Sequence, residues 1–505
     1  MYVQVNGAAT VGISGWPVQV EVDMGAGLPG MDIVGLPDTA VKEAKERVRS
    51  ALKNSGYSYP GKKITINLAP ADLKKDGSAL DAAIAIGILA ASGQVEWQVD
   101  NQIAVLGELG LDGRLRPVDG VLPMLIALQE AGISEVFVPE ENRLEASALK
   151  TLATYPVAYL SEIVKHLQGE EKVARAEIPK LVQELSPIES DFSEVQGQKA
   201  AKRALEIAAA GGHNVLMVGP PGSGKTMLAK RMGGILPPLS EEESLEVSKI
   251  YSVAGLLKGK GLIQQPPFCS PHHTASEASL IGGGRIPKPG QVSLSHRGVL
   301  YLDELPEFER SVLETLRQPL EEGTVQVTRV SGSCDFPARF ILISSMNPCP
   351  CGLLHNTTGE RCKCSQNEIR RYQKKISGPL LDRFDLFVQV YSVPYNELTG
   401  TQKEESSEEI RTRVLKSRAI QTERLKDASI FVNGEMGHGQ IKRMVQLEDR
   451  AVKLVESAFA KLGLSARAYD RLLRVSRTIA DLEGSETVKP EHVAEAIQFR
   501  QPILE

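Results

Sequence analysis

Hydrophobic residues in the first third of the chain alternate between helical and strand spacing. The segment from Pro37 to Gly56 predicts a helix, because its apolar residues recur every three or four positions. Residues 64–68 alternate apolar and polar side chains and predict a half-buried strand. Downstream, the same patterns predict a helix over 79–92, a strand over 103–106, a helix that ends near Gly132 and a strand over 136–138. Residues 1–168 therefore predict an independent α/β domain.

A stretch with a weaker pattern follows this domain. Residues 169–190 are rich in charged side chains, contain two prolines and keep no hydrophobic period for long. Such a composition is typical of a connection between domains. We expect a linker in this stretch.

The rest of the chain changes from mixed to purely helical patterning. A helix predicted over 198–210 stops at two glycines, and the apolar run over 214–218 predicts a strand. From about Ser407 onward only helical spacing recurs, and a proline opens the last helix. This pattern predicts an α/β core over 191–393 and a helical lid over 394–505.

Length and composition narrow the class of protein without fixing its partner. With 505 residues, of which 42% are hydrophobic, the chain is long enough for several cores. Its net charge of -5 gives no general attraction to nucleic acid, so any DNA binding needs a local basic surface. No apolar run reaches about 18 residues, and the first residues lack the pattern of a signal peptide. We expect a cytoplasmic protein without a membrane partner.

A glycine-rich loop follows the predicted strand at 214–218. The sequence Gly219-Pro220-Pro221-Gly222-Ser223-Gly224-Lys225-Thr226 fits the pattern G-x-x-x-x-G-K-[ST] and precedes a predicted helix. In such a loop, backbone N–H groups and the helix N-terminus face the phosphates of ATP. Lys225 then reaches the terminal phosphates, and the Thr226 hydroxyl is a ligand of Mg²⁺. The sequence predicts a site for ATP and Mg²⁺; a glycine-rich turn without a ligand is the alternative.

Two acids end an apolar run further along the chain. Residues 298–302 predict a buried strand, and Asp303 and Glu304 follow it directly. A parallel strand delivers such acids to the edge of the sheet where a phosphate-binding loop lies. We therefore expect Asp303 to hold the Mg²⁺ shell and Glu304 to act as the general base for the attacking water. A solvated strand end is the alternative.

Two basic segments offer cations for contacts with a nucleic-acid backbone. Residues 251–295 read as a long irregular insertion, and such insertions in a compact domain tend to be functional. Residues 324–339 predict a β-hairpin that turns at 331–333. The candidate phosphate contacts in these segments are Lys258, Lys260, Arg285, Lys288 and Arg329. Ordinary solvated loop residues are the alternative.

Four cysteines lie close together in the sequence. They form two C-x-C pairs separated by ten residues: Cys349 and Cys351, then Cys362 and Cys364. Four thiolates on one loop can complete a tetrahedral Zn²⁺ site and stabilise a loop that lacks a core. We expect a structural clip rather than catalysis, with reduced cysteines without metal as the alternative. Three further donors, Cys269, His272 and His273, are interpreted as ordinary loop residues.

The second half of the chain resembles AAA+ P-loop ATPases of the helix-2-insert group, which contains magnesium chelatase motor subunits and minichromosome maintenance helicases. The phosphate loop, the pair of acids and the strand predicted over 340–345 carry this resemblance. It implies that Asn347, just after that strand, orients the lytic water. It also implies that Arg383 reaches the nucleotide of a neighbouring subunit, and that Arg467 on the lid touches the γ-phosphate. In helicases of this group, both basic segments line a central pore.

The first domain resembles the proteolytic domain of Lon-type proteases, an α/β fold of the ribosomal S5 type 2-like kind. The segment Lys75–Ala79 resembles the one that carries their nucleophile, and residues 113–133 resemble the one that carries their catalytic lysine. Ala79 stands at the nucleophile position and Leu122 at the lysine position. Ser78, one position early, has no activating base. The resemblance implies a degenerate Lon-like domain that works as a scaffold or binding module.

Over nearly its full length, the chain resembles the competence-associated ComM family, also called YifB. A Lon-like domain ahead of a helix-2-insert ATPase with a four-cysteine loop carries this resemblance. It implies a homo-hexameric ring that hydrolyses ATP, moves along single-stranded or branched DNA and migrates branches when incoming DNA is recombined. Two other functions stay open. One is a chelatase motor for Mg²⁺ insertion, which the Lon-like domain argues against; the other is protein remodelling without proteolysis.

Overall fold

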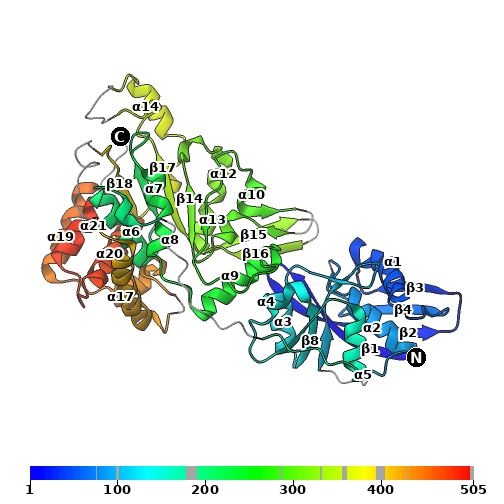
Figure 1. Ribbon diagram of the computed structural model, residues 1–505. Helices are drawn as coiled ribbons and strands as arrows, with labels where there is room; N and C mark the ends of the chain where they lie inside the picture. The colour runs from blue at the N-terminus through cyan, green and yellow to red at the C-terminus, as the bar shows by residue number, and fades with distance from the viewer. Residues whose placement is uncertain are drawn as a thin grey trace. The chain divides into compact units, whose positions relative to one another are not determined.

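The computed structural model divides the chain into two compact units (Figure 1). The described residues are 1–75, 77–97, 102–177, 190–284, 287–329, 332–354, 361–393, 404–428 and 430–500. The first unit, called the N-terminal unit, consists of Met1–Gln183, Glu241–Ile263 and Val330–Phe336. The second unit, called the C-terminal unit, consists of Glu184–Ser240, Gln264–Arg329 and Pro337–Glu505. Most of the predicted linker, residues 178–189, lies outside the described residues.

The N-terminal unit is built on a seven-stranded mixed sheet with the order β3-β4-β2-β1-β5-β8-β9. The strands are β1 (Tyr2–Val11), β2 (Ser14–Gly25), β3 (Gly30–Val34), β4 (Lys63–Ala69), β5 (Ile103–Val105), β8 (Glu135–Pro139) and β9 (Ala153–Val157). The strands predicted over 64–68, 103–106 and 136–138 are confirmed as β4, β5 and β8. The antiparallel hairpin of β1 and β2, which opens the chain, was not among the predicted elements.

Helices cover both faces of this sheet. They are α1 (Thr39–Asn54), α2 (Asp81–Ala91), α3 (Val121–Glu130), α4 (Arg143–Ala146) and α5 (Leu160–Gln168). Residues of α1, α2 and α5 share a hydrophobic core with Val3 and Val5 of β1, whereas α3 packs in a separate core with Ala8. Since residues of alternate parity point to opposite faces of a strand, the two cores lie on opposite sides of the sheet.

The first predicted helix shows how local sequence fixes an element. Asp38 caps α1, because its carboxylate accepts a hydrogen bond from the N–H of Val41 at 2.7 Å. Gly56, with φ of +87°, follows the last turn, in a conformation that favours glycine. The predicted start and stop of this helix are therefore confirmed.

The C-terminal unit is built on a five-stranded sheet with the order β11-β14-β17-β10-β18. Its strands are β10 (Val215–Val218), β11 (Phe268–Cys269), β14 (Val299–Leu302), β17 (Ile341–Met346) and β18 (Leu386–Gln389). All neighbouring pairs are parallel, so the carboxyl ends of the strands share one edge. The strands predicted over 214–218, 298–302 and 340–345 are confirmed. Helix α6 (Lys199–Gly211) precedes β10, and its C-cap Gly212 confirms the predicted stop.

The segment interpreted as a long irregular insertion, residues 251–295, consists mostly of loops, with short helices and strands that were not predicted. The segment begins in the last turn of α9 (Glu241–Val253). It then contains β11, α10 (Glu277–Ile281), β12 (Gly282–Gly283), β13 (Lys288–Pro289) and α11 (Gln291–Leu294). Elements this short give too few repeats of a hydrophobic period to be recognised in the sequence. The second basic segment forms the predicted hairpin, β15 (Thr324–Arg329) with β16 (Gly332–Pro337), and its turn at 330–331 lies outside the described residues.

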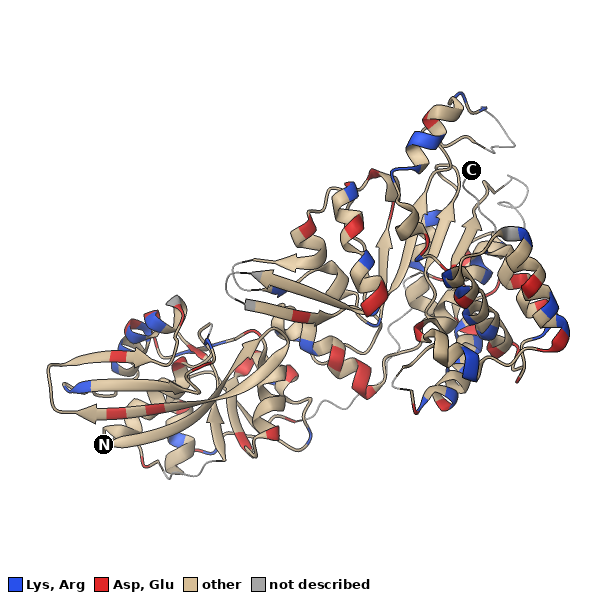
Figure 2. Ribbon diagram, turned by 180° about the vertical axis from the view of Figure 1, so that it is seen from behind, with Lys and Arg blue, Asp and Glu red and all other residues tan. Residues whose placement is uncertain are grey.

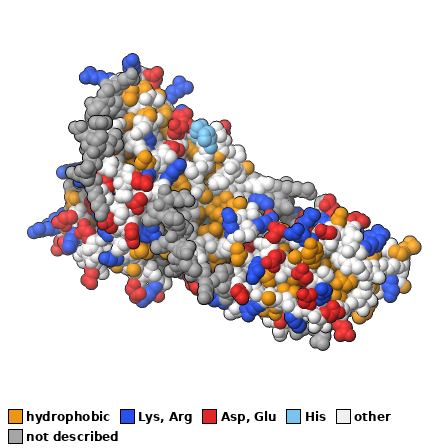
Figure 3. All heavy atoms as spheres, in the orientation of Figure 1, with side chains coloured by type: hydrophobic (Ala, Val, Ile, Leu, Met, Phe, Trp, Pro, Cys, Tyr) orange, Lys and Arg blue, Asp and Glu red, His pale blue; other side chains and the backbone are white. Residues whose placement is uncertain are grey.

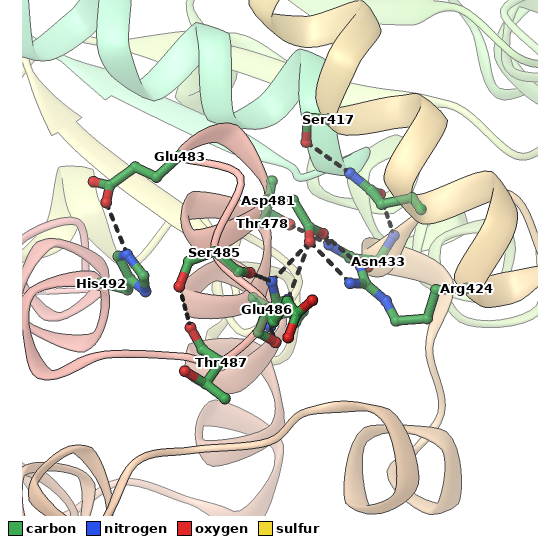
Figure 4. Close-up of polar contacts among 12 residues, drawn as sticks. Ser417, Arg424, Asn433, Thr478, Asp481, Glu483, Ser485, Glu486, Thr487 and His492 are labelled. Carbon is green, nitrogen blue, oxygen red and sulfur yellow. Dashed lines mark hydrogen bonds and ion pairs between the residues drawn. The ribbon is translucent and has the colours of Figure 1, made fainter.

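The end of the chain is helical, as predicted. Its helices are α17 (Ser407–Leu425), α18 (His438–Met444), α19 (Asp449–Leu462), α20 (Ala466–Leu482) and α21 (Pro490–Gln498). A buried carboxylate, Asp481 of α20, joins α17 and the loop between them, since it accepts hydrogen bonds from Arg424 at 2.8 Å and from Asn433 at 2.8 Å (Figure 4). Arg477 pairs with the same carboxylate at 2.9 Å. This network holds the lid helices together.

Charged side chains of both signs are dispersed over the surface. In Figure 2, Lys and Arg lie among Asp and Glu on several helices, and Figure 3 shows both signs mixed over the visible face. This distribution agrees with the small net charge of -5. None of the helices in the described part of the chain has the length and apolar character that a membrane span requires.

Candidate nucleotide site

The predicted phosphate loop connects β10 to α7 (Lys225–Lys230) at the carboxyl edge of the parallel sheet. Gly222 and Gly224 adopt φ of +73° and +88°, which other residues rarely tolerate. Gly219 has a different requirement, because a Cβ there would lie 2.1 Å from the carbonyl oxygen of Val390. The glycines are therefore needed for the path of the backbone, and the loop ends at a helix N-terminus, a place suited to phosphate.

Lys225 is almost fully buried at the first position of α7, with an exposed fraction of 8%. Its ammonium group donates to the carbonyls of Gly219 at 2.7 Å and Pro220 at 2.8 Å, and to Asn347 Oδ1 at 3.3 Å. Burial lowers the pKa of Lys225 to about 8, although Asp303 and Glu304 favour its charged form. A phosphate placed in the loop would supply the negative charge that the buried ammonium lacks.

Thr226 and Asp303, the two predicted Mg²⁺ residues, lie side by side. The Thr226 hydroxyl donates to Asp303 Oδ2 at 2.8 Å, and the Ser345 hydroxyl donates to Asp303 Oδ1. Burial raises the pKa of Asp303, but the hydrogen bonds from Ser345 and Thr226 outweigh this effect and hold the pKa below its ordinary value. An ionised carboxylate beside a hydroxyl offers the oxygen ligands that Mg²⁺ prefers. Ser345 was not among the predicted site residues.

Glu304 follows Asp303 in a strained backbone conformation. Its φ of +51° is uncommon for a residue other than glycine, and such strain is concentrated at functional sites. Its N–H donates to Asp303 Oδ1 at 3.1 Å and to Ser345 Oγ at 3.3 Å, which fixes the backbone. The side chain is 59% exposed, and one carboxylate oxygen lies 3.8 Å from Nδ1 of His273.

His273 was interpreted as an ordinary loop residue, but the structure places it beside the candidate general base. It follows β11, and β11 neighbours β14, so both strands deliver their next residues to the same edge of the sheet. Its ring stacks against that of His272, with centroids 4.1 Å apart. The position of His273 follows from the pairing of β11 with β14, but β11 has only two residues and could not be recognised from the sequence.

Asn347 lies at the end of β17, as predicted, and faces a cavity of about 710 Å³. Glu304 lines the same cavity, together with the cations Arg371 and Lys375. Lys375 also pairs with Glu307 at 3.3 Å. The cavity therefore brings together the predicted base, the predicted water-orienting amide, two further carboxylates, Glu307 and Glu368, and two cations.

The two predicted arginines converge on one carboxylate, Glu321, at the end of α13 (Arg317–Glu322). Arg383 is 4% exposed and pairs with Glu321, and it donates to the Pro379 carbonyl at 2.6 Å. Arg467 is 64% exposed and lies 3.4 Å from the same oxygen of Glu321. Among the contacts of the described residues, neither arginine touches the phosphate loop. Sequence reasoning missed Glu321, since nothing in its neighbourhood marks it.

The four cysteines form a compact cluster directly after Asn347. All four sulfurs lie within 4.8 Å of one another, and three of the separations are 3.4, 3.5 and 3.6 Å. A tetrahedron with Zn–S bonds of about 2.3 Å has S···S edges of about 3.8 Å, so the cluster fits Zn²⁺. Burial raises the pKa of Cys349 to about 12. For Cys351, hydrogen bonds from the Leu353 N–H and the neighbouring thiols outweigh burial and lower the pKa to about 6.

The cysteine loop also contacts the phosphate loop. Gly352 has φ of +78°, and a Cβ on it would lie 2.4 Å from Cδ of Pro221. The cluster therefore lies between the strand end that carries Asn347 and the loop that precedes Lys225.

The predicted phosphate contacts of the basic segments have mixed surroundings. Lys258 pairs with Asp119 at 2.8 Å, within the N-terminal unit. Lys260 and Lys288 are exposed. Arg285 and the side chain of Arg329 lie outside the described residues.

Three protein-family models match the chain. The model described as "Magnesium chelatase, subunit ChlI" matches residues 191–398, which carry the nucleotide site. "Subunit ChlI of Mg-chelatase" matches residues 20–142, and "Magnesium chelatase, subunit ChlI C-terminal" matches residues 404–500. Together with the phosphate loop and the acids at the edge of a parallel sheet, these matches define a magnesium chelatase-like protein of the AAA+ class.

Full-length relatives narrow this class. The chain is 45% identical to "Competence protein ComM" of Haemophilus influenzae over 98% of this chain and 97% of the relative. It is 42% identical to YifB of Escherichia coli over 98% of this chain and 96% of that protein. The "Magnesium-chelatase 38 kDa subunit" of Rhodobacter capsulatus is 26% identical, over 60% of this chain and 84% of its own. The chain belongs to the ComM/YifB family, which confirms the resemblance found in the sequence.

Proposed function

We propose that the protein is an ATP-hydrolysing ring motor that acts on DNA. One observation carries the ATP part: the phosphate loop, its lysine and the predicted Mg²⁺ residues converge at one sheet edge. Lys225 Nζ lies 3.3 Å from Asn347 Oδ1, and Thr226 Oγ1 lies 2.8 Å from Asp303 Oδ2. These residues fit ATP with Mg²⁺, because they combine a buried cation, a hydroxyl, a carboxylate and a helix N-terminus.

In this proposal each residue has a distinct role in hydrolysis. Lys225 binds the terminal phosphates, and Thr226 and Asp303 hold Mg²⁺, which neutralises charge on the phosphates. Glu304 takes the proton of the attacking water, and Asn347 orients that water. The strained backbone of Glu304 and its exposed carboxylate support this role, because the group faces the cavity shared with Asn347.

The ring part of the proposal rests on Arg383 and Arg467. Two guanidinium groups share the single carboxylate of Glu321, so one positive charge is left over. A nucleotide bound by a neighbouring subunit would supply the missing negative charge, and such an arginine is worth about 10³ to 10⁵ in turnover. We therefore propose a homo-hexamer in which Arg383 completes the neighbour's site, while Arg467 on the lid touches the γ-phosphate.

Full-length similarity to a competence protein supports DNA as the substrate. We propose that the motor migrates branches when incoming DNA is recombined, in line with the name of that relative, a competence protein. The exposed Lys260 and Lys288, with Lys258, Arg285 and Arg329, are the proposed contacts to the DNA backbone. Because the net charge is -5, such contacts have to be local.

The N-terminal unit contains the proposed Lon-like domain, residues 1–168, and we propose that it is not a protease. Ala79 and Leu122 stand at the proposed dyad positions, and both are buried, Leu122 fully. Neither side chain can act as a nucleophile or a base. Residues 169–190, 191–393 and 394–505 are the proposed linker, AAA+ core and lid.

The cysteine cluster is the proposed Zn²⁺ site. Its sulfur separations favour metal binding, since four thiolates this close together can surround one Zn²⁺ ion. When bound, Zn²⁺ would fix the loop that contacts Pro221, so its role is structural.

A second candidate function is a chelatase motor, which the family model over residues 191–398 favours. The magnesium chelatase relative covers only 60% of this chain, however, whereas the competence protein covers 98%. The extent of similarity therefore supports the DNA motor over the chelatase motor. Protein remodelling without proteolysis is the third alternative.

The deciding experiment is the ATPase rate with and without single-stranded or branched DNA, over a salt series. We expect stimulation by DNA that fades as salt rises, because phosphate contacts release counterions. Lys225→Ala should abolish ATP binding, while Glu304→Gln should keep ATP bound and abolish hydrolysis. A rate that no DNA alters would favour protein remodelling instead.

A further inference from the structure

Residues Glu241–Ile263 leave the C-terminal unit and return to it. The N–H of Leu239 donates to the carbonyl of Gln264 at 2.9 Å, so both ends of this excursion are held together. Between these ends, the segment clusters with the N-terminal unit. It is braced internally, because the Ser244 hydroxyl donates to the carbonyl of Ile263 at 2.6 Å. The excursion is therefore a closed loop with a fixed base.

A buried carboxylate of the N-terminal unit receives this segment. Glu145 in α4 is 2% exposed and accepts hydrogen bonds from the N–H of Leu122 at 2.9 Å and from Asn142 Nδ2 at 3.2 Å. Its remaining donor is the hydroxyl of Ser252, near the end of α9, which is also 2% exposed. Burial of a carboxylate is costly unless donors surround it, so withdrawal of Ser252 would leave an underpaired buried group.

Further contacts fix the position of residues 252–258 against Asp119 and Gly120. The N–H of Gly120 donates to the Ser252 carbonyl at 3.0 Å, and Lys258 pairs with Asp119 at 2.8 Å. Gly255 has φ of +75°, and a Cβ on it would lie 2.8 Å from Asp119 Oδ1. The segment thus fits its place through a polar contact, an ion pair and a close backbone approach.

Both ends of the excursion connect to the nucleotide site. Helix α8 (Met232–Ile235), which precedes the excursion, follows directly in the chain after α7, the helix that begins with Lys225. After the excursion the chain enters β11, the neighbour of β14, and then reaches His273 beside Glu304. A change at the phosphates is therefore linked along the chain to both ends of the segment.

We propose that residues 241–263 are a coupling segment through which nucleotide turnover drives conformational change in the N-terminal unit. The segment is attached at the Glu145 socket, which consists of Glu145, Leu122 and Gly120 around Ser252. This inference rests on the proposed ATPase function. In consequence, the N-terminal unit is a working part of the motor, and α9 stays in its socket throughout the cycle.

Ser252→Glu tests this, because it places a second carboxylate against the buried Glu145 without touching the nucleotide site. Glu145→Gln in the same chain removes the repulsion and is the rescue variant. Glu242→Gln, at an exposed position of the same helix, is the matched control. Hydrogen exchange of the Gly120 and Leu122 amides reports docking, and exchange across the N-terminal unit with ATP or ADP bound reports coupling.

We expect wild type and Glu242→Gln to show nucleotide-dependent exchange in the N-terminal unit. Ser252→Glu should lose this dependence and expose both amides, while ATPase without DNA stays within about threefold of wild type and DNA strand displacement falls about tenfold. The rescue variant should restore coupling. Should Ser252→Glu fail to fold, the milder Ser252→Ala should show the same losses in part.

Two results would overturn the inference. In the first, the Gly120 and Leu122 amides exchange freely in Ser252→Glu, yet exchange in the N-terminal unit still depends on the nucleotide. In the second, exchange in the N-terminal unit of the wild type is the same with ATP and with ADP. If the proposed function is wrong, the measurements give a different result. In that case wild type neither hydrolyses ATP nor displaces DNA strands, while amide exchange still reports whether ATP binding reaches the N-terminal unit.

Discussion

Raising the pH should weaken ATP binding, because it removes the proton from Lys225. Burial places the pKa of this lysine at about 8 in the nucleotide-free protein. The phosphates of ATP favour the ammonium form, so binding requires the proton and raises the pKa. The lysine is about nine-tenths protonated at about pH 7 and about one-tenth protonated at about pH 9. The dissociation constant for ATP should therefore rise about tenfold over this interval.

The assay is an equilibrium titration with a fluorescent, non-hydrolysable ATP analogue, which keeps Glu304 and its effect on the pKa of Lys225 in place. Lys225→Arg is the control, since a guanidinium does not titrate in this range; whatever its affinity, that affinity should not change with pH. A dissociation constant that is the same at both pH values in the lysine protein would refute the reasoning. It would mean that the ammonium group is not desolvated as its contacts with Gly219 and Pro220 indicate.

Three further predictions concern the groups around the site. Ser345→Ala removes the hydroxyl that orients the Asp303 carboxylate, so half-saturation by Mg²⁺ should need about tenfold more metal; an unchanged Mg²⁺ titration would contradict this. Purified protein should contain zinc that Cys351→Ser loses, with a fall in ATP turnover, as metal analysis and rate measurement can check; equal zinc in both proteins would exclude the cluster. Asp481→Ala leaves the buried Arg477 and the partly buried Arg424 without their carboxylate partner and should lower the free energy of unfolding of the lid by about 3 kcal/mol in denaturant titrations; an unaltered transition would show that the network does not stabilise the lid.

Long or strongly marked elements could be predicted from the sequence. Helix α1 has a full set of signals, with apolar residues at helical spacing and a capping aspartate, and the six strands confirmed in the two sheets had clear apolar or alternating patterns. The phosphate loop was recognisable because its residues are contiguous. Elements and motifs that depend on a few neighbouring residues can therefore be predicted without knowledge of the fold.

The elements that escaped prediction depend on contacts distant in sequence. His273 comes close to Glu304 only because the two-residue strand β11 pairs with β14. Glu321 becomes notable only when Arg383 and Arg467 meet on it. The docking of Ser252 on Glu145 joins residues more than a hundred positions apart in the chain. No periodicity in a single sequence encodes such encounters.

The central claim is that one subunit's arginine completes the nucleotide site of its neighbour. Its most direct test mixes two inactive variants, Lys225→Ala, which cannot bind ATP, and Arg383→Ala, which lacks the arginine. In a random equal mixture, about a quarter of the interfaces pair an intact phosphate loop with an intact arginine, so about a quarter of the wild-type rate should return. A mixture that stays inactive at every ratio, or an Arg383→Ala protein that turns over at full speed alone, would contradict the account.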